Sequence, residues 1–256
     1  MARLRPPPAH SILITGASSG IGAALARCYA RPGTHLALGG RDPGRLAAIA
    51  AECRQAGAYV AEQSIDVTDR EAMAAWIGRT DRAAPLDLVI ANAGTAGRHL
   101  PHGPERTRTI FAVNLEGVLN TIEPAEAAMT ARGRGHLALM SSVASFYGSP
   151  DSPAYSSSKA AVRFLGESLR PRLAQIGILV SVICPGYVET PMTAGVRPRV
   201  PFTTSAEQAA TIIERGLARG QARIAFPFAT YCVVRLLAIL PSSLAAWLTA
   251  RPPAKA

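Results

Sequence analysis

The sequence has few aromatic residues and no run of basic residues interleaved with them. Phe, Trp and Tyr make up 5% of 256 residues, and the 27 lysines and arginines are nearly all arginine and are scattered along the chain. The formal net charge is +10. However, proteins that bind nucleic acid gather their basic groups on one face. The pattern argues against nucleic acid as a partner, and the positive field favours anionic small molecules, including a phosphorylated cofactor.

Cysteine is also scarce. The four cysteines, Cys28, Cys53, Cys184 and Cys232, show no Cys-x-x-Cys spacing, and three of them fall within expected helices or strands. Neither a metal site nor a disulfide framework is indicated, so we expect a reduced, cytoplasmic protein. The first eight residues, rich in proline and arginine, lack the apolar core of a signal peptide, and we expect none.

Low-complexity linkers and internal repeats are absent as well. Hydrophobic residues make up 48% of the chain and charged residues 17%, which suits a large buried core rather than disorder. The sequence therefore predicts one domain over residues 1–256, with a loop for the substrate at about 187–204 and an apolar tail at about 228–256.

Short apolar runs alternate with helical segments along most of the chain. The runs at 11–15, 35–39, 58–64, 86–91, 136–141, 179–184 and 223–226 predict strands. Helices are expected from the glycine-rich turn to about 29 and over 44–56, 70–80, 105–131, 153–176 and 205–219. Such alternation is typical of a parallel sheet covered on both faces. We therefore predict an α/β, Rossmann-like doubly wound parallel sheet of about seven strands.

A glycine-rich turn follows the first expected strand. Residues 15–22 read Thr-Gly-Ala-Ser-Ser-Gly-Ile-Gly, and glycine permits a tight turn and a close approach of phosphate to the backbone. The helix that follows offers free N–H groups and the positive end of its dipole to a pyrophosphate. We expect dinucleotide binding by Gly16, Ser18, Ser19, Gly20, Ile21 and Gly22.

The end of the second expected strand bears on the choice of cofactor. Sites that prefer NAD carry a carboxylate there for the ribose 2′-hydroxyl, whereas an arginine suits a 2′-phosphate. Gly40 stands where the carboxylate would be, and Arg41 follows it. The sequence therefore favours NADP over NAD. Two alternatives stay open: a shift of two residues would bring in Asp42, and Arg41 would otherwise only open a solvated turn.

Tyr155 and Lys159 stand four residues apart, and Ser142 lies thirteen residues before the tyrosine. Residues i and i+4 share one face of a helix. An ammonium group beside a phenol favours the phenolate. A free tyrosine titrates near ~10, which is too high for an efficient acid–base group near neutrality. The trio has the chemistry of a proton-transfer device for a carbonyl group.

In this order and spacing, the motifs resemble the short-chain dehydrogenase/reductase family, in its single-domain branch with TGxxxGxG and YxxxK motifs. The matching residues are the turn at 15–22, Asp66, Val67, Asn92, Ala93, Gly94, Asn114, Ser141, Ser142, Tyr155, Lys159, Pro185, Gly186 and Thr190. The resemblance implies an oxidoreductase that moves a hydride between a nicotinamide cofactor and a ketone or secondary alcohol. It also implies a homodimer or homotetramer.

The resemblance implies roles for four catalytic residues. Ser142 would donate a hydrogen bond to the substrate oxygen, and Tyr155 would be the acid–base group. Lys159 would hold the nicotinamide ribose and lower the pKa of the tyrosine, and Asn114 would anchor a water that leads to that lysine. Taken singly, Asn114 could also be a buried polar residue bonded to backbone, and Ser142 could simply end a strand.

The remaining matched residues are implied to bind the cofactor. Asp66 would accept a hydrogen bond from the adenine, with Val67 beside it, although an N-cap for the next helix is the alternative for Asp66. The fourth strand would contribute Asn92, Ala93 and Gly94, and the nicotinamide would meet Pro185, Gly186, Val188 and Thr190. Ser19 stands where many NADP-preferring relatives carry a basic residue, which leaves Arg41 as the main phosphate ligand.

The expected lining of the substrate region is mostly apolar. It comprises Ala96, Ala144, Phe146, Tyr147, Pro150 and Met192, with Arg197 and Arg199 either meeting an anionic group or lying on the surface. This favours a lipophilic or acyl-chain carbonyl substrate. A 3-oxoacyl reductase-type enzyme of lipid synthesis is the alternative. A non-catalytic NADP-sensing protein is the alternative from another class.

The sequence leaves two alternative roles open for the apolar tail. Residues 230–240 are apolar almost all round, with Arg235 the one charged residue, and Pro241 ends a stretch too short to span a bilayer. The tail would pack on the protein's own core or on another subunit. Alternatively, it would contact a membrane at its periphery or form a wall for a lipophilic substrate.

Overall fold

A seven-stranded, wholly parallel sheet forms the centre of the computed structural model, which describes residue 6 and residues 8–194, 202–241 and 243–245. The strand order is β3-β2-β1-β4-β5-β6-β9. The strands are β1 (Ser11–Thr15), β2 (His35–Gly40), β3 (Tyr59–Ser64), β4 (Leu88–Ala91), β5 (Gly135–Met140), β6 (Ile178–Pro185) and β9 (Arg223–Phe226). The predicted doubly wound sheet of about seven strands is confirmed.

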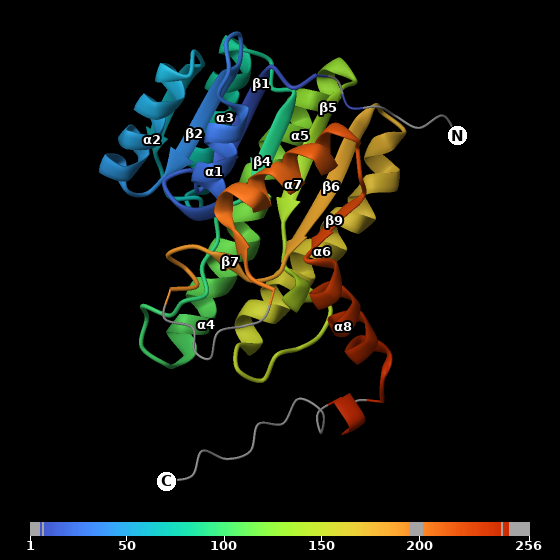
Figure 1. The fold of residues 1–256 in the computed structure, drawn as a ribbon. Helices are drawn as coiled ribbons and strands as arrows, with labels where there is room; N and C mark the ends of the chain where they lie inside the picture. Colours follow the sequence, from blue (N-terminus) through green and yellow to red (C-terminus); the bar gives the residue numbers. More distant parts are fainter. Residues whose placement is uncertain (1–5, 7, 195–201, 242, 246–256) are drawn as a thin grey trace.

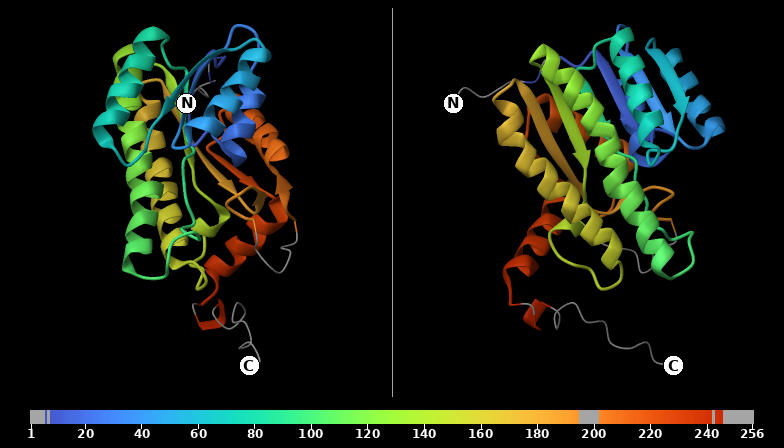
Figure 2. Two further views of the ribbon diagram at one scale, coloured as in Figure 1. Left: turned by 90° about the vertical axis from the view of Figure 1, so that its left-hand side faces the viewer. Right: turned by 180° about the vertical axis from the view of Figure 1, so that it is seen from behind.

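Helices cover both faces of this sheet (Figures 1 and 2). They are α1 (Gly20–Tyr29), α2 (Pro43–Gln55), α3 (Arg70–Ala83), α4 (Pro104–Phe111), α5 (Gly117–Arg132), α6 (Pro153–Ala174), α7 (Ala206–Ala218) and α8 (Phe228–Ile239). One cluster of buried aliphatic side chains joins the sheet to α1, α2 and α7, and a second joins it to α3, α5 and α6. Because the central strands are buried on both faces, they read as continuous apolar runs.

Local capping explains where several helices begin. The side chains of Asp42 and Asp69 accept hydrogen bonds from the backbone of α2 and α3, and Ser205 forms a reciprocal capping box at the start of α7. Each cap satisfies N–H groups that the first helical turn leaves unpaired. Asp69, not Asp66, therefore caps α3.

The single long helix expected over 105–131 is interrupted. Between α4 and α5 lies a π-helical segment, η1 (Ala112–Glu116). Within it Asn114 is fully buried: its Oδ1 accepts from the Thr95 N–H at 2.7 Å, and its Nδ2 donates to the Thr95 carbonyl at 3.0 Å. Such segments are rare and occur often at functional sites. The change from α-helix to π-helix accompanies the contact of Asn114 with Thr95, which is 19 residues away in the chain. The sequence around Asn114 alone does not encode that contact.

Two short additions lie beyond the main sheet, at the carboxyl ends of its strands. β7 (Val188–Glu189) pairs with β8 (Thr204–Ser205), which brackets the expected substrate loop. Helix α8 follows β9 and extends away from the layered body (Figures 1 and 2). Among the described helices, none has both the length and the hydrophobicity needed to cross a bilayer.

Candidate active site

A cleft opens at the carboxyl ends of β1 and β4, on either side of the point where the strand order reverses. Ligands of open α/β sheets bind at such a point. Every residue expected to bind the dinucleotide lines this cleft, from Gly16 in the first turn to Thr190 beyond β6. Of the four residues expected to be catalytic, Tyr155 and Lys159 lie in the lining itself.

The glycine turn forms one end of the cleft. Gly16 and Gly20 have φ angles of 68° and 54°, in the left-handed region that favours glycine. A Cβ on Gly22 would clash with the carbonyl oxygen of Gly16, so the turn requires a glycine at position 22. Helix α1 then begins without a side-chain cap from Ser19. The turn and the uncapped helix end therefore fit an anionic group such as a pyrophosphate.

Asn92 and Thr15 tie the end of β4 to this turn. The hydroxyl of Thr15 accepts from the N–H groups of Asn92 and Ala93 at 3.0 and 3.1 Å. The side-chain amide of Asn92 donates to the carbonyls of Thr15 and Gly16 at 2.9 and 3.3 Å. These bonds hold the two central loops of the cleft in fixed register.

Two arginines stand at the rim beyond β2. Arg41 and Arg45 both line the cleft and are exposed, and Gly40 packs against Ser18. The carboxylate of Asp42 caps α2 and pairs with the Arg45 side chain at 2.8 Å, and the hydrogen bonds from Arg45 lower the pKa of Asp42. Sequence reasoning missed Arg45, although its place in the first turn of α2, four residues after Arg41, was a usable signal.

The serine, tyrosine and lysine meet at the other end of the cleft. Ser142 is the second residue after β5, whereas Tyr155 and Lys159 lie in the first two turns of α6. The Ser142 hydroxyl donates to the Pro185 carbonyl at 3.3 Å and is close enough to Tyr155 to influence the pKa of its phenol. The Lys159 ammonium lies 5.9 Å from the centroid of the Tyr155 ring. Lys159 is buried, and its Nζ donates to the Met140 carbonyl at 2.9 Å.

Burial dominates the electrostatics of this group. Desolvation raises the pKa of the Tyr155 phenol, and the nearby Ser142 hydroxyl partly offsets this rise. Desolvation also lowers the pKa of Lys159 to about 8. In this structure the pKa of Tyr155 is raised rather than lowered, because low-dielectric surroundings disfavour the charged forms of both groups.

Asn114 lies behind Lys159. A Cβ on Gly94 would stand 3.2 Å from both the Asn114 Oδ1 and the Lys159 Nζ, so glycine leaves room for the two side chains to converge. The Asn114 amide also donates to the Ser158 hydroxyl at 3.0 Å. Asn114 is therefore hydrogen-bonded to backbone, which fits a purely structural role. It also lies next to Lys159, which fits the expected role of anchoring a water near that lysine.

Some expected substrate residues lie elsewhere. Phe146 is only 8% exposed and packs with Val182 and Cys184 rather than lining the cleft, so the expectation that it borders the substrate is not met. Met192 does line the cleft. Arg197 and Arg199 fall outside the described residues.

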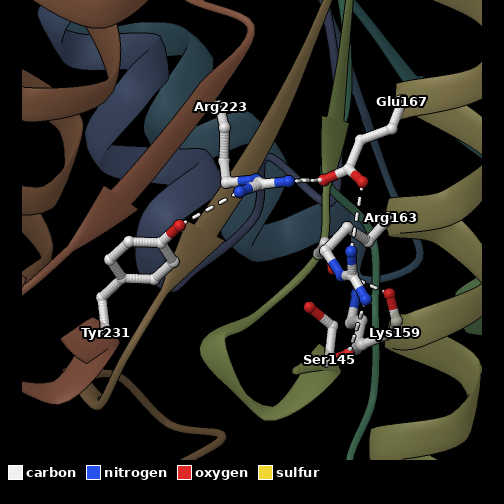
Figure 3. A network of polar contacts seen from close by, with 7 residues as sticks. Ser145, Lys159, Arg163, Glu167, Arg223 and Tyr231 are labelled. Carbon is white, nitrogen blue, oxygen red and sulfur yellow. Dashed lines mark hydrogen bonds and ion pairs between the residues drawn. The ribbon is translucent and has the colours of Figure 1, made fainter. Parts of the chain in front are cut away.

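A polar network that sequence reasoning missed continues along α6 beyond the lysine (Figure 3). The Glu167 carboxylate accepts from Arg163 at 3.1 Å and from Arg223 Nε at 3.0 Å, and Arg223 also donates to the Tyr231 hydroxyl at 3.0 Å. Arg163 in turn donates to the Ser145 carbonyl at 3.3 Å. The network joins the catalytic helix to β9 and α8. From the sequence, only the pair of Arg163 and Glu167 could have been expected, because its members stand four residues apart on one helix.

A metal-binding group is not evident. In the parts of the chain that the structure describes, no three His, Cys, Asp or Glu side chains gather in a way that could hold a metal ion, and the four cysteines are free thiols.

Comparisons with known proteins agree with this geometry. The model of the family described as short chain dehydrogenase matches residues 10–201. An uncharacterized oxidoreductase of Myxococcus xanthus (strain DK1622) is 38% identical over 240 residues, which cover 92% of this chain and 94% of that protein.

Solved structures show the same fold. A short-chain dehydrogenase from Sphingobium yanoikuyae in complex with NADPH has a TM-score of 0.79 at 27% identity, covering 96% of this chain and 98% of that one. A 3-oxoacyl-[acyl-carrier protein] reductase from Brucella melitensis with bound NAD has a TM-score of 0.73 at 26% identity, covering 87% of this chain and 92% of that one.

Proposed function

The chain belongs to the short-chain dehydrogenase family and is an oxidoreductase acting on CH–OH and C=O groups, and we propose that it is an NADP-dependent reductase of lipophilic or acyl-chain ketones. One observation carries the proposal. Tyr155 lies beside the buried Lys159 in the lining of a cleft whose other end is a glycine turn that fits a pyrophosphate, and Ser142 is close enough to Tyr155 to influence its pKa.

The chain's own residues would handle the proton. When bound, the dinucleotide would supply or accept a hydride at the substrate carbon. Ser142 would donate a hydrogen bond to the substrate oxygen as negative charge develops there, and Tyr155 would give that oxygen a proton. Lys159 would hold the ribose hydroxyls, and Asn114 would anchor a water between the lysine and solvent. In the oxidative direction Tyr155 would accept the proton instead.

The rim beyond β2 supports NADP over NAD. Arg41 and Arg45 bring two positive charges to the cleft, whereas the Asp42 carboxylate is engaged by the α2 backbone and by Arg45. A 2′-phosphate would meet two guanidinium groups there, and arginine suits such a ligand. The similar structures hold NADPH in one case and NAD in another, so the preference rests on the two arginines.

A lipophilic substrate is supported by apolar side chains at the carboxyl end of the sheet. Met192 lines the cleft, and α8 stands at the same end of the sheet with its apolar side chains exposed. The likeness to a 3-oxoacyl-[acyl-carrier protein] reductase favours a 3-oxoacyl thioester as a second candidate substrate. Both substrates require the same proton transfer from Tyr155.

A cytoplasmic homodimer or homotetramer completes the proposal. The oligomer rests on the family resemblance. The cytoplasmic location rests on cysteines that show no Cys-x-x-Cys spacing. A non-catalytic NADP sensor is the competing reading from another class, and a complete serine, tyrosine and lysine set speaks against it.

The experiment is NADPH oxidation with a panel of aliphatic ketones and 3-oxoacyl thioesters of increasing chain length, repeated with NADH. The proposal predicts turnover that rises with chain length and a lower KM for NADPH than for NADH. Tight NADPH binding without turnover on any member of the panel would favour the sensor and contradict the proposal.

A further inference from the structure

Helix α8 has two apolar faces. Tyr231, Val234 and Leu237 lie on the half-buried inner face, toward the body of the protein. The outer face carries Phe228, Val233, Leu236 and Ile239, with exposures of 76, 57, 57 and 73%. A surface helix of a soluble protein normally turns charged and polar residues to solvent. The outer face of α8 is therefore built for contact with something other than water.

The helix is firmly attached through its inner face. Tyr231 meets the Phe146 ring edge-on at 5.3 Å between centroids and accepts a hydrogen bond from Arg223 at 3.0 Å. Tyr231 and Val234 also pack on the small cluster formed by Phe146, Val182 and Cys184. These contacts fix the direction in which the outer face points, so its exposure does not result from a loosely placed helix.

The charges of this region have one sign. Helix α8 contains one charged residue, Arg235, which is exposed, and no acidic residue, and the whole chain carries a formal charge of +10. Apolar side chains accompanied only by basic ones match the boundary between the acyl chains and the headgroups of an anionic bilayer. We propose that α8 docks on an anionic lipid surface through Phe228, Val233, Leu236 and Ile239.

The size of the outer face argues against a second copy of the chain as the occupant. A helix of 12 residues is about 18 Å long and about 10 Å wide, which gives a face of roughly 180 Å². A stable dimer needs about 800 Å² from each partner. A lipid surface has no such threshold, since a few inserted side chains and electrostatic attraction suffice for reversible binding.

The test is co-sedimentation of the full chain with vesicles of phosphatidylglycerol and phosphatidylcholine, and with vesicles of phosphatidylcholine alone. The test variant is Leu236→Glu with Ile239→Glu. The matched control is Tyr59→Glu with Ile212→Glu, which adds the same charge at two exposed apolar residues on β3 and α7. We expect the wild type and the control to bind the anionic vesicles and the test variant to bind about tenfold less or weaker still.

Two results would overturn the proposal. One is a wild-type chain that stays in the supernatant with anionic vesicles. The other is equal sedimentation of the test variant and the control. If the test variant instead changes the oligomeric state on size exclusion without any vesicle binding, α8 is an interface between copies. Ketone reduction is assayed separately without lipid, so failure of the docking proposal and failure of the proposed reaction can be told apart.

Discussion

A buried histidine makes the stability of this protein sensitive to acid. His136, in β5, is 3% exposed, and its Nε2 lies 2.8 Å from the Ser181 hydroxyl. That hydroxyl donates its only proton to the Gln221 carbonyl, so the histidine donates to it from Nε2. Burial, helped by the nearby Arg170 guanidinium, lowers the pKa of His136 from 6.5 to about 4.

The sign and size of the pH effect follow from the difference between the pKa of His136 in the folded chain and in the unfolded chain. Below pH 6.5 the unfolded chain binds a proton at this position, whereas the folded chain does not until about pH 4. The neutral histidine therefore contributes its full stability above pH 6.5 and loses it progressively as the pH falls toward 4. At pH 4.5 the loss is about 2 to 3 kcal/mol in the free energy of unfolding.

Urea denaturation at pH 7.5 and pH 4.5 measures this effect. His136→Gln removes the titrating group but keeps an amide donor, so the difference in stability between the two pH values should shrink by about 2 to 3 kcal/mol. The matched control is His99→Gln, because His99 is exposed. An unchanged pH dependence in His136→Gln would refute the reasoning, even if the variant is less stable at both pH values.

Three further predictions concern the cleft and its support. Arg45→Ala, like Arg41→Ala, should raise KM for NADPH about tenfold or more while KM for NADH changes little, because a charged hydrogen bond to the 2′-phosphate is lost; equal changes in both KM values would contradict the assignment. Glu167→Gln should lower the free energy of unfolding by about 1 to 2 kcal/mol by leaving the buried Arg163 and the half-buried Arg223 without their carboxylate, which a urea melt would show. Gly22→Ala should cost about 1 to 3 kcal/mol through its clash with Gly16 and weaken dinucleotide binding by titration; unaltered affinity would mean that the turn is not the pyrophosphate site.

The fold was predictable because its signals are local. Strands buried on both faces are continuous apolar runs, and the turn at 15–22 has a composition that few other structures require. The cleft lining was predictable from the motifs for the same reason, since parallel strands bring their carboxyl ends to one edge.

Features set by contacts between distant residues were not predictable. The π-helical segment at Asn114 accompanies a contact with Thr95, and Glu167 finds Arg223 across 56 residues of chain. Phe146 was placed beside the substrate because it follows Ser142 closely. However, the 3₁₀ turn at Val143–Ser145 carries Phe146 into the core. No pattern along the chain distinguishes these outcomes in advance.

The most direct test of the central claim is the Tyr155→Phe variant. The reaction is followed as NADPH oxidation with the best ketone of the panel, and NADPH affinity is measured separately by fluorescence titration. Removing the proton donor while keeping the ring should lower kcat at least about 100-fold and leave the Kd for NADPH nearly unchanged. A variant that turns over near the wild-type rate would show that Tyr155 is not the acid–base group of this enzyme.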